Sequence, residues 1–277
     1  MTQAPAPPLA ADGTLDMLPP LRVTSADEVV WQETREMVVV GLGAAGAAAA
    51  LSAREHNVEV LVLERFNGGG ATIKSGGVVY LGGGTRLQKE AGYHDTPEAM
   101  YHYLQEECGT AVGEATLRQF CEGSTELFAW LESLGVPFAS HPHPPKTSYP
   151  RNGVYLYYSG NEGVPARAAL AKPAPRGHRV KAPGIDSGRE LYRILAAQAE
   201  TRGATVWRQA GVRRLITDAA GAVLGVEVWR LPEGSQAAKQ HRDNAYQLAE
   251  IADGLEVVRY GSEPRPEVVH AGGDRGE

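Results

Sequence analysis

"EMVVVGLGAAGAAAALSAREHNVEVLVLE", residues 36–64, is the stretch that decides the fold we expect for this chain. Met37–Val40 is a continuous apolar run that ends at a glycine, which is typical of a strand buried on both faces of a parallel sheet. Ala44–His56 is rich in Ala and Leu and predicts a helix, and Asn57 suits the left-handed turn just past a helix end. Val58–Leu63 then resumes a strand. The stretch predicts an α/β fold whose strand–helix–strand unit closes with a right-handed crossover.

Three glycines at GxGxxG spacing, Gly41, Gly43 and Gly46, lie between the first strand and the helix. The motif alone is weak, but here Gly41 permits a tight turn, Gly43 lets a pyrophosphate approach the backbone, and Gly46 lets helix and strand pack closely. The helix start adds unpaired N–H groups and a positive dipole end. Glu64 ends the second strand, where a carboxylate can bind both ribose hydroxyls and would repel the 2′-phosphate of NADP. The alternative is a glycine turn that binds no ligand.

A second glycine-rich stretch, residues 64–85, begins at that acid. Glycine loses more backbone entropy on folding than any other residue, so this density needs a reason. A flexible linker would be rich in Ser, whereas Val78–Leu81 indicates a buried strand. An NAD site needs little beyond the first loop, but a flavin adds a rigid tricycle that must lie along backbone. We expect N–H groups of Gly68–Thr72 to bind the pyrophosphate and Ser75–Gly77 to lie beside the isoalloxazine, so FAD is the predicted cofactor.

The rest of the chain sets the expected domain boundaries. We expect a disordered leader over residues 1–36, an FAD-binding domain over residues 37–234, and a polar, irregular tail over residues 235–277. Within the domain, residues 96–186 are expected to form a helical and irregular segment beside the flavin.

Several local patterns place elements within that domain. Thr96 is the expected cap of a helix with Pro97 at its first position. Residues 187–203 predict another helix, and residues 204–231 predict three strands with a turn at Asp218–Gly221.

Composition excludes several classes of function. The net charge is −6, with Lys and Arg mixed among the acids, so we expect no nucleic-acid partner. No apolar run reaches the roughly 18 residues of a membrane span, and the N-terminus lacks the basic start of a signal peptide. Cys108 and Cys121 are too few and too far apart for a metal or redox pair and predict buried thiols. A cytoplasmic location is the expectation.

Several motifs resemble a known family. "GLGAAG", "LERFNGGGATIKSGG" and "WLESLGVPF" are similar to the FAD-binding domain shared by fumarate reductase flavoproteins and 3-ketosteroid dehydrogenases. "GGGATIKSGGVVYLGGGT", "DTPEAMYHYL", "YLYYSGNE" and "AKPAPRGHR" resemble the branch of 3-oxo-5α-steroid 4-dehydrogenases, which oxidise their substrates at C4–C5. The resemblance covers residues 37–231. One departure is Asn57, where the family more often has Gly.

The resemblance implies a Rossmann-like FAD-binding fold with a parallel sheet, helices and a three-strand β-meander. It implies pyrophosphate binding by the first glycine loop, ribose binding by Glu64, phosphate and flavin binding by the second loop, and adenine pairing by the backbone of Val212. The cofactor-binding residues it implies are Gly41, Gly43, Ala44, Ala45, Gly46, Glu64, Arg65, Gly69, Gly70, Ala71, Thr72, Ser75, Gly76, Gly77 and Val212.

The resemblance also implies an activity. An oxidoreductase of this type acts on CH–CH groups of a small apolar ketone or steroid, with hydride passing to flavin N5 while a protein base removes a neighbouring proton. In the family, the substrate domain and most proton-handling residues follow the meander, so we expect this chain to be the N-terminal portion of such an enzyme. No catalytic residue is assigned, and the oligomeric state stays open. The alternatives are a fumarate or urocanate reductase-type flavoprotein and a non-catalytic FAD-binding remnant.

Two groups of aromatic and imidazole side chains are further candidates. Tyr155, Tyr157 and Tyr158 could donate to a substrate oxyanion, but alternating tyrosines are more typical of a half-buried strand. His141 and His143 form an HxH pair without a third ligand nearby, so no metal site is expected.

The "PRGHR" segment is the last candidate. Arg176, His178 and Arg179 could line an anionic or oxygenated pocket, or they could hold an irregular loop through hydrogen bonds to carbonyls. Ser124 and Ser187 stand at helix starts, where capping explains them.

Overall fold

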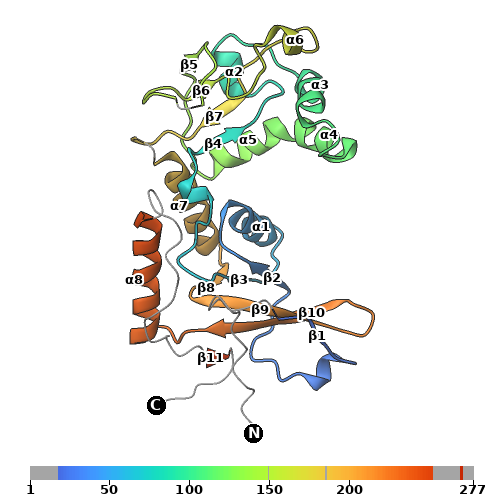
Figure 1. Ribbon diagram of the computed structural model, residues 1–277, viewed down its shortest axis with the longest axis vertical. Helices are drawn as coiled ribbons and strands as arrows, with labels where there is room; N and C mark the ends of the chain where they lie inside the picture. The colour runs from blue at the N-terminus through green and yellow to red at the C-terminus, as the bar shows by residue number, and fades with distance from the viewer. Residues whose placement is uncertain (1–17, 149, 185, 252–268, 271–277) are drawn as a thin grey trace. The chain divides into compact units, whose positions relative to one another are not determined.

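The structure is a computed structural model that describes residues 18–148, 150–184, 186–251 and 269–270 (Figure 1). The chain divides into two compact units. The first unit combines Met1–Gly68 with Ala199–Glu277, and the second is Gly69–Gln198.

The first unit contains the predicted strand–helix–strand motif. A parallel sheet has the order β2-β3-β8. Its elements are β2 (Met37–Val40), α1 (Ala44–Glu55), β3 (Val60–Leu63) and β8 (Thr205–Trp207). Val39 pairs with Val62 in the register of β2 and β3, and all of β3, the central strand, is buried. β2 was predicted to be buried on both faces, but it is an edge strand of this sheet and most of its residues are exposed. Asn57 has φ 60°, which confirms the left-handed turn expected after the helix. The predicted Rossmann-like topology is therefore present.

A second sheet of the first unit has the order β1-β9-β10-β11. Its strands are β1 (Leu21–Arg22), β9 (Ala210–Thr217), β10 (Val223–Arg230) and β11 (Val269–His270). The turn between β9 and β10 is held by Asp218, whose Oδ1 accepts from the N–H of Ala222 at 2.8 Å. The three predicted strands at residues 204–231 are all present, and they divide between two sheets. β8 pairs with β3, whereas β9 and β10 form a hairpin.

The described part of the expected leader is structured. β1 runs parallel to β9, and a 3₁₀ helix, η1 (Ala26–Glu28), follows it. The Trp31 indole N–H donates to the Ala26 carbonyl at 2.9 Å, and its ring fills the space that a side chain at Gly225 would need. Residues 18–36 thus differ from the predicted disorder, because strand pairing and one half-buried indole compensate for their lack of periodicity. Residues 1–17 lie outside the described part.

The tail also differs from the prediction of an irregular segment. Helix α8 (Gln236–Ile251) begins after Ser235, whose Oγ accepts from the N–H of Ala238 at 3.1 Å. Ala238 is buried, and His241, one turn later on the same face, stacks on Phe66. This polar helix is stable because one narrow face of it packs against other residues of the first unit, such as Phe66. The average polarity of the sequence does not reveal that contact.

The second unit combines a sheet of order β4-β7-β6-β5 with helices. Its elements are η2 (Thr72–Lys74), β4 (Val78–Tyr80), α2 (Arg86–Glu90), α3 (Pro97–Cys108), α4 (Glu114–Glu122), α5 (Ser124–Ser133), β5 (Pro142–His143), β6 (Leu156–Tyr157), α6 (Pro165–Ala168), β7 (Gly177–Arg179) and most of α7 (Ser187–Thr201). Thr96 caps α3 by accepting from the N–H of Ala99 at 3.0 Å, which confirms that predicted start. In the described residues, no helix is long and apolar enough to cross a membrane.

Candidate functional site

The first glycine loop joins β2 to α1. Gly41 has φ +94°, a conformation that favours glycine, and its N–H donates to the Leu63 carbonyl at 2.8 Å. A side chain at Gly46 would overlap the carbonyl oxygen of Gly41, so helix and loop touch through their backbones. Gly43 is the N-cap of α1 and offers no side-chain cap. The helix start is therefore open to an anion in the way that the motif predicts.

The carboxylate of Glu64 is held at the end of β3 and is only 9% exposed. Its Oε2 accepts from the N–H of Leu42 at 2.8 Å, and its Oε1 accepts from the N–H of Phe66 at 2.7 Å. Each carboxylate oxygen has a second lone-pair direction available for a further donor. The side chain therefore links the strand end to the glycine loop and can still accept from two hydroxyls.

The second glycine loop lies in the second unit and is shaped by α7. Gly77 has φ +63°, and a side chain there would overlap the backbone of Ser187. In the same way, a side chain at Gly188 would overlap the carbonyl oxygens of Thr72 and Ser75. The need for glycine at position 77 therefore comes from contact with α7. Gly76 differs, because it is exposed and a side chain there would meet no atom closer than 3.9 Å.

The structure places each implied cofactor residue within one of the two units. Val212 packs against the buried Leu61 and Leu63, and a side chain at its neighbour Gly211 would contact Arg65 at 3.4 Å. The first unit holds Gly41, Gly43, Ala44, Ala45, Gly46, Glu64, Arg65 and Val212, and the second holds Gly69, Gly70, Ala71, Thr72, Ser75, Gly76 and Gly77. Their roles in FAD binding stay predictions.

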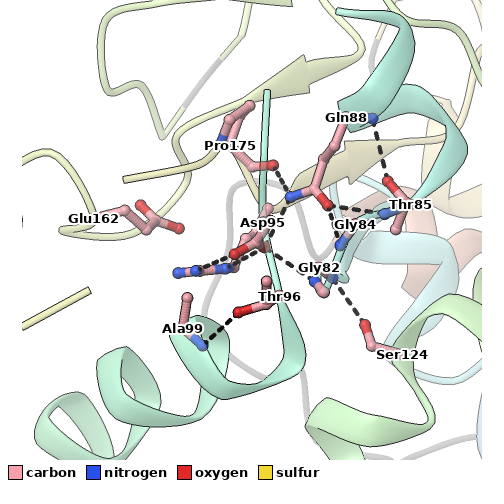
Figure 2. A network of polar contacts seen from close by, with 12 residues as sticks. Gly82, Gly84, Thr85, Gln88, Asp95, Thr96, Ala99, Ser124, Glu162 and Pro175 are labelled. Carbon is pink, nitrogen blue, oxygen red and sulfur yellow. Dashed lines mark hydrogen bonds and ion pairs between the residues drawn. The ribbon is translucent and has the colours of Figure 1, made fainter. Parts of the chain in front are cut away.

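A buried ion pair that sequence reasoning missed organises the second unit (Figure 2). Asp95 and Arg176 are buried, and the carboxylate accepts from Nε at 2.9 Å and from Nη2 at 2.8 Å. Asp95 also accepts from the N–H of Gly83 and from Nε2 of Gln88, both at 3.0 Å. Gln88 completes a capping box with Thr85. The T-x-x-Q spacing of residues 85–88 is the sequence signal that could have revealed part of this network.

His178 is a neutral member of the same region. Its Nε2 lies 2.8 Å from the Thr85 hydroxyl, and its Nδ1 lies 3.0 Å from the Arg176 carbonyl oxygen. A carbonyl only accepts, so Nδ1 carries the proton and Nε2 accepts from Thr85. Burial lowers the pKa of His178 to about 4. The ring is therefore uncharged at neutral pH.

Glu162 is buried beside the guanidinium of Arg176. Its Oε1 accepts from the Tyr80 hydroxyl at 3.0 Å, and its Oε2 accepts from the N–H of Gly160 at 3.0 Å. Burial is the largest cause of the raised pKa of Glu162, and it also raises the pKa of Tyr80. Most polar groups of this region thus bind one another, whereas the buried Nη1 of Arg176 has no hydrogen-bond partner among the described residues.

The remaining candidates have structural roles. Arg179 donates to the Ser187 hydroxyl at 3.1 Å and to the carbonyl of Gly184, which is the loop-holding alternative expected for the "PRGHR" segment. Ser124 differs from the expected capping role, because Gly123 is the N-cap of α5 and the buried Ser124 hydroxyl accepts from the N–H of Gly82 at 2.8 Å. Helix position alone could not reveal that partner.

The tyrosines and histidines also pack. Tyr157 is buried in β6, Tyr158 lies edge-on to Tyr93, and Tyr155 contacts His141. Among the described residues, no group of His, Cys, Asp or Glu could hold a metal ion.

Comparison with known proteins gives the family. A model described as the FAD binding domain matches residues 36–252, and the chain belongs to that family. A 3-oxo-5-alpha-steroid 4-dehydrogenase of Comamonas testosteroni is 48% identical over 226 residues, which are 80% of this chain and 42% of that enzyme. A urocanate reductase of Eggerthella lenta is 39% identical over 98 residues, which are 35% of this chain and 16% of that enzyme.

Solved structures agree. A 3-ketosteroid-delta4-(5alpha)-dehydrogenase of Rhodococcus jostii RHA1, in complex with 4-androstene-3,17-dione, matches with a TM-score of 0.72 and 37% identity. The match covers 76% of this chain and 45% of that one. The chain spans less than half the length of these relatives. The predicted family and Rossmann-like FAD-binding fold are confirmed, and FAD is the cofactor that the family indicates.

The residues present fit that cofactor. The uncapped start of α1 suits a phosphate, and the Glu64 oxygens suit two hydroxyls. Open backbone at Gly76 suits a flat ring.

Proposed function

Starting from membership of the FAD binding domain family, we propose that the first unit binds the adenosine and pyrophosphate of FAD. The loop at residues 41–46 holds the pyrophosphate at the start of α1, Glu64 accepts from the ribose hydroxyls, and the backbone of Val212 pairs with the adenine, with Arg65 beside it. The observation that carries this proposal is the Glu64 carboxylate, held by the N–H groups of Leu42 and Phe66.

We propose for the second unit that the loop at residues 69–72 holds the phosphates and that Ser75–Gly77 lie beside the isoalloxazine. Gly76 supports this role because its surroundings are open. The domain boundaries at residues 37 and 234 belong to the same proposal.

The test of cofactor binding is a titration of the purified chain with FAD, followed by quenching of flavin fluorescence. We expect saturable binding, and Glu64→Ala should weaken it by about 10- to 100-fold because a charged acceptor of two hydrogen bonds is lost. Glu55→Ala is the matched control, since that exposed carboxylate pairs with Arg202 on the surface. Equal binding by parent and Glu64→Ala would contradict the assignment of the ribose site.

For the activity, we propose an FAD-dependent oxidoreductase of the 3-oxo-5α-steroid 4-dehydrogenase type, acting on an apolar 3-ketone. The support is the 48% identity to the Comamonas enzyme and the Rhodococcus structure that contains a steroid. When bound, FAD supplies the hydride acceptor, and the residues of this chain hold and orient it. The described part contributes no assigned acid or base, so a catalytic residue is not proposed.

Anaerobic addition of a 3-oxo-5α-steroid to the FAD-loaded protein tests the activity. Bleaching of the flavin absorbance supports the dehydrogenase. Oxidation of a reduced flavin by urocanate or fumarate would instead favour the reductase alternative. The similarity to a urocanate reductase is the observation that supports this alternative. Loaded protein inert to both would support a non-catalytic FAD-binding remnant.

We also propose a cytoplasmic location, in keeping with Cys108 and Cys121, which form no disulfide.

A further inference from the structure

The turn after β3, residues 65–67, controls the position of the Glu64 carboxylate. The N–H of Phe66 donates to Glu64 Oε1 at 2.7 Å. The carbonyl oxygen of Phe66 accepts from Nε2 of Gln209 at 2.9 Å, and that same amide donates to Oδ1 of Asn67 at 3.0 Å. A displacement of Phe66 would therefore move one of the two donors that orient the carboxylate.

Helix α8 holds the other side of this turn. The rings of His241 and Phe66 are stacked, with centroids 5.3 Å apart and planes inclined by 21°. Asn67 Nδ2 donates to the Arg242 carbonyl at 3.1 Å, which ties the turn to the same segment of α8. The guanidinium carbon of Arg65 lies 4.5 Å from the centroid of the Phe66 ring. Phe66 thus has an imidazole and a guanidinium as its ring contacts.

The state of His241 favours stacking. Its Nδ1 is buried and has no hydrogen-bond partner among the described residues. Burial, and then the nearby Arg65, lower the pKa of His241, so the ring is neutral at neutral pH. An imidazole without a hydrogen bond at this nitrogen contributes here as a flat ring. That is a role that phenylalanine can also fill.

We propose that His241 is a positioning residue for the adenosine half of FAD. In this proposal, which rests on the proposed function, stacking of His241 on Phe66 holds the Phe66 N–H against Glu64 and so keeps the carboxylate aimed at the ribose. Helix α8, in a segment that the sequence predicts as irregular, is then part of the cofactor site without touching the cofactor.

The experiment compares His241→Ala, His241→Leu and His241→Phe with the parent chain. FAD, ADP and FMN are titrated separately, because ADP carries the adenosine and pyrophosphate and FMN lacks the adenosine. Stacked aromatic pairs predict about 3- to 10-fold weaker binding of FAD and ADP for the Ala variant. We expect a similar loss for Leu, which keeps apolar bulk without a ring, recovery for Phe, and unchanged FMN binding for all. Gln240→Ala, exposed on the same helix, is the control.

Three results would overturn the inference: parent-like FAD binding by both the Ala and Leu variants, an equal loss for FMN, or failure of Phe to recover affinity. Thermal unfolding without ligand identifies a variant that does not fold, and the Leu and Phe variants then decide the outcome. A parent chain that binds no FAD would overturn the proposed function and this inference together, so the two failures are distinguishable.

Discussion

Two glycine-rich loops of this chain, residues 41–46 in the first unit and residues 69–77 in the second, use glycine for different reasons. In the first loop, Gly46 lets α1 approach the carbonyl of Gly41 inside the proposed binding motif. In the second loop, Gly77 lets the backbone approach Ser187 of α7, whereas Gly76 faces open space. The same residue type therefore belongs to the proposed ligand-binding turn in one unit and, at Gly77, serves internal packing in the other.

The polar groups of the two units differ in the same sense. Among the described residues, Glu64 accepts from the backbone N–H groups of Leu42 and Phe66 and keeps capacity for further donors. Asp95, in the second unit, accepts from Arg176, Gly83 and Gln88. A buried carboxylate that accepts from several internal donors indicates a structural role, whereas spare acceptor capacity beside the proposed phosphate-binding turn indicates a ligand.

The largest effect is expected from Asp95→Ala. It leaves the buried Arg176 guanidinium without its carboxylate, and such a loss costs about 3–5 kcal/mol. The measurement is chemical denaturation. Glu98→Ala, which removes an exposed carboxylate of the adjacent helix, is the control and should change the free energy of unfolding little. A parent-like stability of Asp95→Ala would refute the structural role of the network.

A pH effect of up to about 3 kcal/mol is expected from His178, whose folded pKa of about 4 lies below the ordinary value of 6.5. Between these values the unfolded state binds more protons. This contribution to stability is therefore complete above pH 6.5, falls as the pH falls, and is lost near pH 4. The pKa of Glu162 is raised from its ordinary value of 4.5, so the contribution of Glu162 to stability falls as the pH rises above that value.

The measurement that isolates His178 is the difference in unfolding free energy between the parent and His178→Asn at pH 5 and pH 7. We expect the difference to shrink at pH 5, because only the parent has the histidine to protonate. An equal difference at the two pH values would contradict the buried, uncharged state of His178.

The two neighbouring glycines of the second loop provide a matched pair. Gly77→Ala should lower stability by about 1–3 kcal/mol, because its side chain overlaps backbone and its φ is positive. Gly76→Ala should leave stability nearly unchanged and weaken FAD binding, since its side chain would occupy the open space proposed for the flavin. Thermal unfolding and FAD titration of both variants separate packing from binding. Equal stability losses would remove the distinction between the two positions.

The smallest effect is expected at a glycine that neither packing nor ligand requires. The added side chain of Gly163→Ala would lie more than 4 Å from any neighbouring atom, and the φ of Gly163 is not positive. We expect a change of at most about 0.5 kcal/mol in stability and no change in FAD affinity, measured in the same two assays. A larger loss of stability would show that replacing any glycine of this chain is costly, so that the specific backbone contacts of Gly46 and Gly77 would not explain their effects.

Much of the fold could be predicted because its signals are local. The apolar run at Met37–Val40, the glycine spacing that follows and the acid at Glu64 lie within one strand–helix–strand unit, and the structure has each element there. Asn57 was predictable for the same reason, since a left-handed helix end is a property of a few adjacent residues. Val212 remains a prediction from resemblance.

What the sequence by itself determined is the family, the cofactor class and the residues of the first glycine loop, because backbone conformation and short spacings carry that information. Only the tertiary structure decided that α8 is a helix packed on Phe66, that Gly77 serves α7, and that Arg176 pairs with Asp95. Asp95 and Arg176 lie 81 positions apart in the chain. The physical reason is that a buried charge or ring is stabilised by its neighbours in space, and no local pattern specifies which distant residue that neighbour is.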